Sequence, residues 1–279
     1  MSVRMPFYWR DVEPTKDQWN LSYNDPFVAV GEQNQITILG LLGYSTEWST
    51  SNPTGSADDL YYPPADNQAF AAYAKALVAR YPQVTDWEVW NEPNLWCFWR
   101  PHPDPAQYTA LLKETYTAAK AANPECTIVL GGLSSGGGWQ DTILPEDFLR
   151  AVYNAGGKGY FDVVAIHPYS QVQQPQDYLA DQIERVRRVM EDFGDSAKPI
   201  WITEIGWYTR GDPSAVDEAV QAERVRQVFS IAGQYPFVTK VFWYQLQDCG
   251  NDANNPQQNY GLFRADGGAK PAVTAYAGL

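Results

Sequence analysis

The chain has 279 residues, of which 44% are hydrophobic and 19% charged, with a formal net charge of −13. This length can bury a large core, and the acidic balance argues against nucleic acid and disfavours an anionic polymer as substrate. Eleven Trp and 18 Tyr supply flat apolar faces with polar edges, which suit sugar rings and large cores alike.

Features of metal, disulfide and membrane proteins are sparse. Cys97, Cys126 and Cys249 form no C-x-x-C pair, and two histidines, His102 and His167, are too few for a multi-His metal site. We therefore expect no metal and no cofactor. No apolar stretch or basic run suits a membrane. The first residues do not resemble a signal peptide, which leaves the cytoplasm, or secretion of a protein whose N-terminus is missing.

Seven short apolar or aromatic runs recur along the chain, each followed by a helical pattern. Most are nearly continuous in hydrophobicity, as in parallel strands that are covered on both faces. The predicted strands cover residues 3–9, 36–42, 86–91, 127–133, 161–167, 199–205 and 240–246.

Helices with recognisable ends lie between these strands. Asp104 and Pro105 have the character of an N-cap and a first-turn proline. Gly156 and Gly194 are placed to end helices in the left-handed conformation. The predicted helices cover residues 67–81, 106–122, 146–155, 177–193 and 216–235.

Strands and helices alternate without a linker, which predicts an α/β fold: a (β/α)8-type TIM barrel forming one catalytic domain over residues 1–279. A doubly wound open sheet is the alternative, but no G-x-G-x-x-G follows any strand. A closed barrel of this kind needs eight strands, whereas seven are counted. The chain therefore either closes irregularly or lacks one βα unit.

Two glutamates, Glu92 and Glu204, stand at the ends of the third and sixth predicted strands. In a barrel these ends share one rim, where catalytic groups collect. Either glutamate alone is more often a surface residue or half of an ion pair. Together, and among tryptophans, they suit glycoside hydrolysis, in which one carboxyl protonates the leaving oxygen and the other attacks the anomeric carbon or activates water.

The segment V-W-N-E-P-N-L-W-C-F-W at 89–99 resembles the acid/base segment of retaining glycoside hydrolases of clan A, most of all family 39. I-T-E-I-G-W at 202–207 resembles the nucleophile strand of the clan, and I-H-P-Y at 166–169 resembles its sixth-strand ending. The similarity in order and spacing covers essentially the whole chain. It implies that Glu92 is the acid/base and Glu204 the nucleophile.

The resemblance also implies roles for further positions. Asn91 is expected to hydrogen-bond the sugar 2-hydroxyl, and Trp243 to form the floor of the sugar subsite. Tyr169 is expected to orient the nucleophile, and Arg4 to stabilise its negative charge. Burial among aromatic rings should favour the protonated form of the acid/base.

Other candidates are weaker. His167 is predicted as a substrate or nucleophile contact, and Trp48, Trp96 and Trp139 are candidate sugar platforms in rim loops, with loop packing as the alternative. Glu88 is predicted to point into the barrel as half of a buried ion pair.

In the clan, the acid/base and nucleophile lie on strands four and seven, whereas only two predicted strands precede Glu92. The first βα unit is therefore expected to be absent. Another segment, or another subunit of a homo-oligomer, is expected to cover the open edge between the strands at 3–9 and 240–246.

The sequence thus predicts a retaining glycosidase for neutral β-xylosides or β-glucosides, with a β-linked oligosaccharide or polysaccharide as its partner. An endo-acting polysaccharide hydrolase of the same clan is one alternative. A second alternative is a non-catalytic or weakly active carbohydrate-binding protein that has lost activity through truncation. An esterase with Ser134 in G-x-S-x-G is disfavoured, because no helix directly follows that serine.

Overall fold

The strands of the chain form one parallel sheet, which the computed structural model describes over residues 1–136, 141–169, 175–250, 252 and 254–279. Their order in the sheet is their order in the chain. The strands are β1 (Ser2–Tyr8), β2 (Thr37–Gly43), β3 (Asp86–Asn91), β4 (Thr127–Ser134), β5 (Val164–His167), β6 (Ile200–Ile205) and β7 (Val238–Trp243). All seven predicted strands are present, and the α/β fold class is confirmed.

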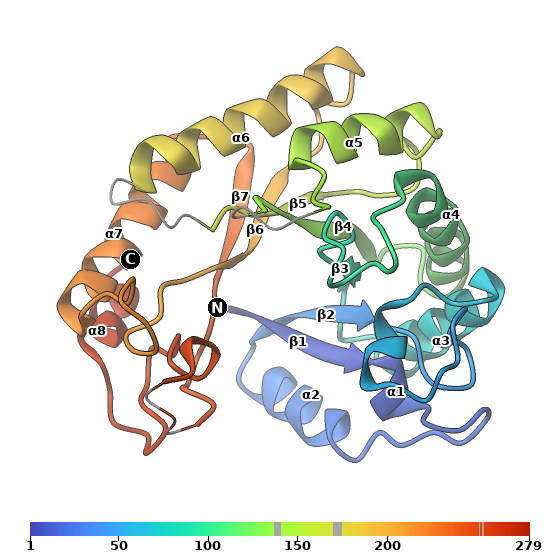
Figure 1. Cartoon of the computed structure of the whole chain (residues 1–279), viewed down its shortest axis with the longest axis horizontal. Helices are drawn as coiled ribbons and strands as arrows, with labels where there is room; N and C mark the ends of the chain where they lie inside the picture. The colour runs from blue at the N-terminus through green and yellow to red at the C-terminus, as the bar shows by residue number, and fades with distance from the viewer. Residues whose placement is uncertain (137–140, 170–174, 251, 253) are drawn as a thin grey trace.

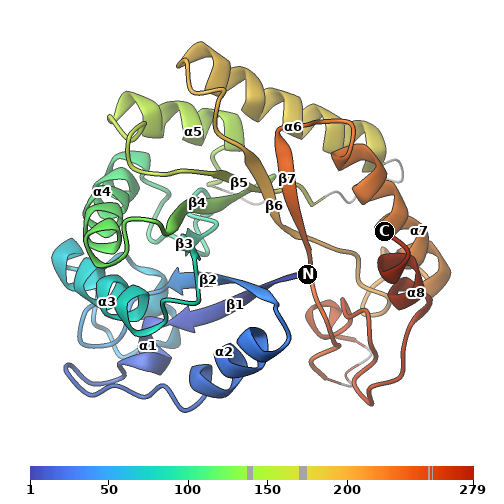
Figure 2. The same cartoon turned by 180° about the vertical axis from the view of Figure 1, so that it is seen from behind.

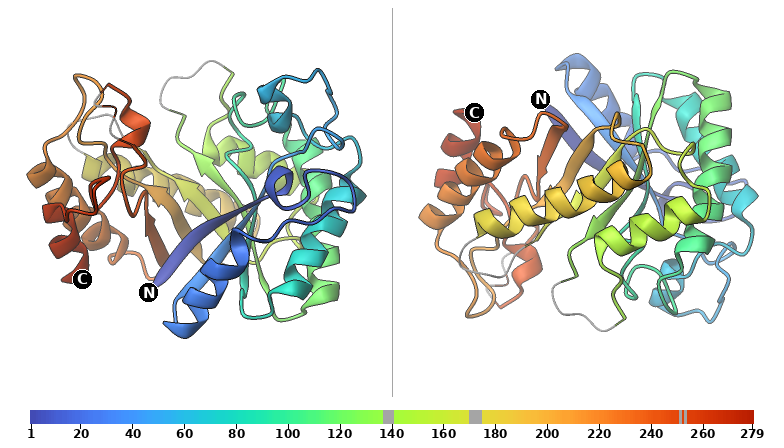
Figure 3. Two further views of the ribbon diagram at one scale, coloured as in Figure 1. Left: turned by 90° about the horizontal axis from the view of Figure 1, so that it is seen from below. Right: turned by 90° about the horizontal axis from the view of Figure 1, so that it is seen from above.

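Helices surround the outer side of the curved sheet, which gives a half-barrel with strands inside (Figures 1 and 3). The described α-helices are α1 (Trp9–Val12), α2 (Asn24–Gln33), α3 (Asn67–Arg80), α4 (Pro105–Ala122), α5 (Pro145–Asn154), α6 (Pro175–Asp192), α7 (Glu218–Ala232) and α8 (Pro271–Ala277), with 3-10 turns η1 (Ala57–Tyr61) and η2 (Pro256–Gln258). Within these described ranges, no helix combines the length and apolarity that a bilayer span requires.

The predicted helix ends follow from local chemistry. The carboxylate of Asp104 accepts hydrogen bonds from the backbone N–H groups of Ala106 and Gln107, both at 2.9 Å, and so caps α4. Gly156 and Gly194 follow α5 and α6 with φ of +76° and +60°, the left-handed conformation that glycine adopts most easily. These three predicted signals are confirmed.

Side chains alternate along the strands between two apolar cores. Phe7 and Trp87 belong to the large core between sheet and helices. Leu39, Trp201 and Phe242 belong to a smaller core inside the half-barrel. The nearly continuous hydrophobicity of the strands follows from this coverage on both faces.

The half-barrel is open between its two edge strands, because β1 and β7 form no ladder with one another in the described residues. A cavity of about 510 Å³ lies between these edges, with Val3 and Phe242 among its lining residues. Figures 1 and 2 place the N-terminus in this gap. The irregular closure considered from the sequence is therefore wrong, and the lack of one unit is the correct alternative.

Helix α2, next to β1, leaves apolar side chains in solvent. Tyr23, Phe27 and Val30 recur at helical spacing and are 58%, 53% and 51% exposed. Together with the open edge of β1, this row of side chains is consistent with a missing neighbour. Homo-oligomerisation through this edge stays a prediction, which sedimentation velocity would test.

We expect Gly40→Ala to destabilise the fold. A Cβ atom at this position of β2 would lie 2.5 Å from Cε3 of Trp87, whose buried ring cannot move aside. Overpacking of this kind costs about 1–3 kcal/mol, which urea unfolding followed by tryptophan fluorescence would measure. Gly159→Ala is the matched control, because a Cβ there meets no atom within 4 Å. Equal stability of the two variants would contradict this account of the sheet.

Candidate active site

Two carboxylates meet at the rim formed by the carboxyl ends of the strands. Glu92 directly follows β3, and Glu204 lies near the end of β6. A carboxylate oxygen of one lies within 4.8 Å of a carboxylate oxygen of the other. Their side chains are only 9% and 16% exposed. The structure thus brings the two predicted catalytic glutamates together in a largely buried setting.

The backbone around Glu92 is held in an unusual conformation. Trp90 and Glu92 have φ of +71° and +46°, in the left-handed region that non-glycine residues rarely adopt. The N–H of Glu92 donates to the carbonyl of Gly132 at 3.1 Å, and its own carbonyl accepts from Leu95 at 3.0 Å. Such conformations cost on the order of 1–3 kcal/mol each and concentrate at functional sites. Here they aim the carboxylate across the top of the half-barrel.

Arg4 on β1 connects three side chains from two other strands. Its guanidinium forms ion pairs with Glu88 and Glu204, and its Nη2 donates to Oδ1 of Asn91 at 2.8 Å. Glu88 is fully buried, and the predicted buried ion pair is confirmed. Burial acts to lower the pKa of Arg4, but the two carboxylates outweigh it and raise the pKa well above its ordinary value.

Glu204 is surrounded by donors that favour its ionised form. Tyr169 donates from its hydroxyl to Oε2 at 3.1 Å, and Arg4 contacts Oε1. Burial acts to raise the pKa of Glu204, but the charges of His167 and Arg4 and the tyrosine hydrogen bond lower it below its ordinary value. These surroundings therefore favour the charged carboxylate form of Glu204.

His167, at the end of β5, lies behind the two carboxylates. Its ring is fully buried, with Nδ1 2.8 Å from Oε1 of Glu92 and Nε2 2.9 Å from Oγ1 of Thr203. Nδ1 also lies 3.9 Å from Oε2 of Glu204. The side chain predicted as a substrate or nucleophile contact is thus hydrogen-bonded to the other glutamate and has no exposed surface for a sugar.

The cavity beside Glu204 has an aromatic wall. Arg4, Glu204, Trp243 and Tyr244 are among its lining residues. Trp243 packs against Trp207 with ring centroids 5.8 Å apart and the planes inclined by 33°. Trp243, the predicted floor residue, therefore lines the same cavity as Glu204.

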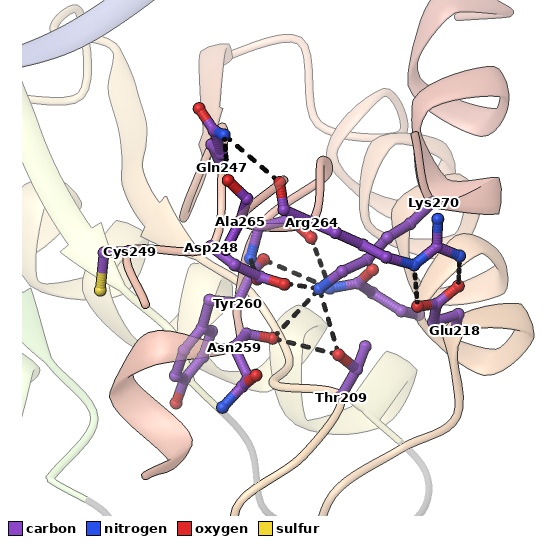
Figure 4. Close-up of polar contacts among 12 residues, drawn as sticks. Thr209, Glu218, Gln247, Asp248, Cys249, Asn259, Tyr260, Arg264, Ala265 and Lys270 are labelled. Carbon is purple, nitrogen blue, oxygen red and sulfur yellow. Dashed lines mark hydrogen bonds and ion pairs between the residues drawn. The ribbon is translucent and has the colours of Figure 1, made fainter. Parts of the chain in front are cut away.

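The long connection after β7 is fixed by a buried lysine (Figure 4). Nζ of Lys270 donates to Oδ1 of Asp248 at 2.9 Å, to Oγ1 of Thr209 at 3.1 Å and to the carbonyl of Asn259 at 3.4 Å. Since Lys270 is only 2% exposed, its ion pair with Asp248 is shielded from solvent. Lys270 thereby joins the connection after β7 to the loop after β6, the strand that carries Glu204.

The rim tryptophans differ in their surroundings. Trp48 is half-buried and packs edge-on against Trp9, with centroids 5.0 Å apart, as loop packing predicts. The guanidinium carbon of Arg100 lies over the ring of Trp96, 5.0 Å from the ring centroid. Trp139 falls outside the described residues. A role of these side chains as sugar platforms stays a prediction.

Sequence reasoning missed three residues that complete the site. Thr203 directly precedes Glu204, so strict alternation would turn its side chain to the opposite face. The register of β6 on β7 shifts between Ile202 and Ile205, so that the side chains of both Thr203 and Glu204 reach the centre. No feature of the sequence around Gly132 indicates that this residue belongs to the site. Tyr8 ends β1 on the same rim as the glutamates, a placement that could have identified it. Burial raises the pKa of Tyr8, Arg4 acts to lower it, and Glu204 acts to raise it.

One group in the described residues has the spacing of a metal site. Ligand atoms of Glu92, His167 and Glu204 lie within 4.8 Å of one another. However, Nδ1 of the imidazole is already hydrogen-bonded to Glu92, and the guanidinium of Arg4 contacts Glu204. A cation would face this fixed positive charge, so the donor set fits proton chemistry better than a metal ion.

Comparisons with known proteins give consistent results. Residues 65–276 match the family described as glycosyl hydrolase catalytic core. A β-xylosidase of Geobacillus stearothermophilus is 25% identical over 242 residues, which cover 77% of this chain and 46% of that protein. A family 39 glycoside hydrolase from the gut symbiont Bacteroides cellulosilyticus WH2 superposes with a TM-score of 0.78 and 28% identity, over 99% of this chain and 57% of the other.

A monomeric β-xylosidase from Caulobacter crescentus CB15 has a TM-score of 0.75 and 21% identity, over 98% of this chain and 60% of the other. The chain spans about half the length of the curated relative. These likenesses confirm the resemblance to family 39 that the sequence predicts.

We expect Arg4→Met to lower the free energy of unfolding by about 3–5 kcal/mol, because it leaves Glu88 buried without a counter-charge. In the double variant Arg4→Met/Glu88→Gln the loss should be smaller than the sum of the two single losses, since the orphaned charge is gone. Urea unfolding of the four proteins measures the coupling. Arg226→Met, which removes the exposed pair with Glu223, is the control and should change little. If the loss in the double variant equalled the sum of the two single losses, Arg4 and Glu88 would not be coupled, and the ion-pair network would be contradicted.

Proposed function

Because the chain belongs to the glycosyl hydrolase catalytic core family, we propose that it is a retaining glycosidase, with Glu92 as acid/base and Glu204 as nucleophile. In this proposal residues 1–279 act as one catalytic unit.

The spacing of the two carboxylates is the observation that carries the proposal. Retaining glycosidases hold their two carboxyl groups about 5–5.5 Å apart, whereas inverting enzymes leave roughly 6.5–9.5 Å for a water molecule. Glu92 and Glu204 offer oxygens within 4.8 Å of one another. This distance supports direct attack by a carboxylate rather than by an intervening water.

The surroundings of the two groups support their division of labour. Arg4 and Tyr169 keep Glu204 ionised, so that its oxygen can attack the anomeric carbon as Glu92 protonates the leaving oxygen. Glu92 then takes a proton from water, the hydroxide attacks the same carbon, and the carboxylate of Glu204 is released. Asn91, fixed by Arg4, is the candidate partner of the sugar 2-hydroxyl.

Neutral β-xylosides or β-glucosides are the proposed substrates, in the form of a β-linked oligosaccharide or polysaccharide. The β-xylosidases among the relatives support this substrate class, and so does Trp243 beside the nucleophile. The acidic net charge of −13 disfavours anionic sugars.

One observation favours a second candidate, a carbohydrate-binding protein without turnover. The cavity that contains Arg4 and Glu204 lies at the open edge of the half-barrel, where its lining also includes the edge residues Val3 and Phe242. Solvent entering there would weaken the electrostatic interactions of the catalytic groups. Sugar binding without hydrolysis would then remain.

The proposal is tested on a panel of aryl β-glycosides. We expect Glu204→Ala to lower kcat by roughly 10⁴-fold or more, and Glu92→Ala to lower turnover of poor leaving groups by roughly 10²–10⁴-fold. Azide should rescue both variants with opposite stereochemistry. The nucleophile variant should release the α-glycosyl azide, and the acid/base variant the β-glycosyl azide.

Full activity of Glu204→Ala would contradict the assignment. A silent wild type that still binds xylo- or gluco-oligosaccharides in calorimetry would favour the binding protein. Glu223→Ala, on the exposed side of α7, is the matched control for removing a carboxylate.

A further inference from the structure

The buried imidazole of His167 occupies a place that only glycine leaves free. A Cβ atom on Gly132 of β4 would lie 2.1 Å from Nε2 and 2.5 Å from Cδ2 of this ring. The ring is therefore packed directly against the backbone of β4, with no freedom to withdraw from Glu92. Its two nitrogens have fixed partners, and the partners determine which nitrogen carries a proton.

The proton on Nε2 follows from a chain of three groups. Glu88 is paired with Arg4 and ionised, so it can only accept hydrogen bonds. The hydroxyl of Thr203 donates its single proton to Oε1 of Glu88 at 2.9 Å. Thr203 must then accept from His167, and Nε2 of the imidazole carries a hydrogen.

The contact on the other nitrogen also requires a proton. Nδ1 of His167 lies 2.8 Å from Oε1 of Glu92, a distance at which two bare lone pairs would repel one another. The proton there belongs either to the imidazole or to the carboxyl group. If it belonged to the carboxyl group, it would point at the imidazole and away from a leaving group.

The charge of the cluster favours the imidazole. Arg4 contributes one positive charge, and Glu88 and Glu204 contribute one negative charge each. With Glu92 protonated, the sum is zero if His167 is cationic and −1 if it is neutral. A buried cluster is more stable when its charges are compensated, because the solvent cannot compensate them.

We propose that His167 is a positively charged positioning residue, whose Nδ1–H holds Oε1 of Glu92 so that the second carboxyl oxygen presents the catalytic proton to the leaving group. This inference rests on the proposed function and deepens it, because it names the residue that orients the acid/base.

The same charge count holds through the reaction. When Glu204 becomes a neutral ester, Glu92 has given its proton to the leaving oxygen, and the carboxylate that remains is paired with the imidazolium. The sum of charges is zero before and after this step. In the second step water supplies a proton to Glu92 and hydroxide to the anomeric carbon, which restores the carboxylate of Glu204.

The charged groups around the ring are consistent with this state. Burial acts to lower the pKa of His167, and Arg4 adds to that effect, but Glu204 and Glu92 outweigh both and raise it. Tyr169 lies edge-on to the ring at a centroid distance of 6.5 Å. A raised pKa means that the imidazolium persists above the ordinary pKa of about 6.5 and is lost only as the pH rises further.

Nitrogen-15 NMR of the intact chain tests the charge state without any substrate. The chain has two histidines, so the ring signals of His167 and the exposed His102 are readily separated. At pH 7 we expect both ring nitrogens of His167 in the protonated range. A neutral His167 with a bare Nδ1 at pH 7 would overturn the proposal.

Kinetics tests the positioning role. With His167→Gln the positive charge beside Glu92 is lost, so the alkaline limb of kcat/KM should move up by at least about one pH unit. Hydrolysis of poor leaving groups should fall by roughly tenfold or more, with a smaller effect on activated ones. A merely structural role would lower all rates without shifting the alkaline limb of kcat/KM. An alkaline limb at the same pH as in the wild type would therefore contradict the proposal.

Matched variants separate the contact from general damage. Gly132→Ala should displace the ring and reproduce both effects, whereas Gly43→Ala, whose Cβ meets its nearest atom at 4.0 Å, should not. His102→Gln should leave the pH profile of kcat/KM unchanged. An inactive wild type with a cationic His167 would refute the proposed function alone, and an active one with a neutral His167 would refute this inference alone.

Discussion

The ion pairs of Arg4 are the interaction on which the rest of the structure depends. Its guanidinium on the edge strand β1 reaches Glu88 at the middle of the sheet and Glu204 on β6. All three side chains are largely or fully removed from water, and a buried charge without its partner is costly. Therefore β1 cannot move away from the half-barrel without leaving two carboxylates uncompensated, although it is an edge strand with one unpaired side.

The same network links stability to proton chemistry. Glu88 is not placed to touch a substrate, because it is fully buried, yet it accepts from Thr203 and so fixes the hydrogen of the neighbouring imidazole. Arg4 meanwhile favours the ionised form of Glu204. The residues that hold the strands together are thus the residues that set where protons and charges reside at the rim.

Local sequence patterns were sufficient for the strands and the two glutamates, because apolar runs and the W-N-E-P-N segment are contiguous. They were insufficient for α2, where Pro26 and Gly31 interrupt the helical pattern. A Cβ on Gly31 would lie 2.8 Å from Cδ1 of Ile38, a contact between elements that the local pattern does not reveal. They also missed Thr203 and Gly132, whose importance lies in contacts between strands. His167 was expected as a substrate or nucleophile contact. Its Nδ1 does lie 3.9 Å from Oε2 of Glu204, but a position at a strand end does not reveal how deeply the ring is buried.

The open edge affects the two needs of catalysis differently. The contact between Arg4 and Glu204 runs through the inside of the half-barrel, so residues on the described strands complete the charged centre without a closing strand. The cavity between β1 and β7 is different, because both edges line it. Whatever covers that edge therefore controls water entry into this cavity and the shape of the cavity. Proton placement is intrinsic to the seven strands, whereas exclusion of solvent depends on what covers their open edge.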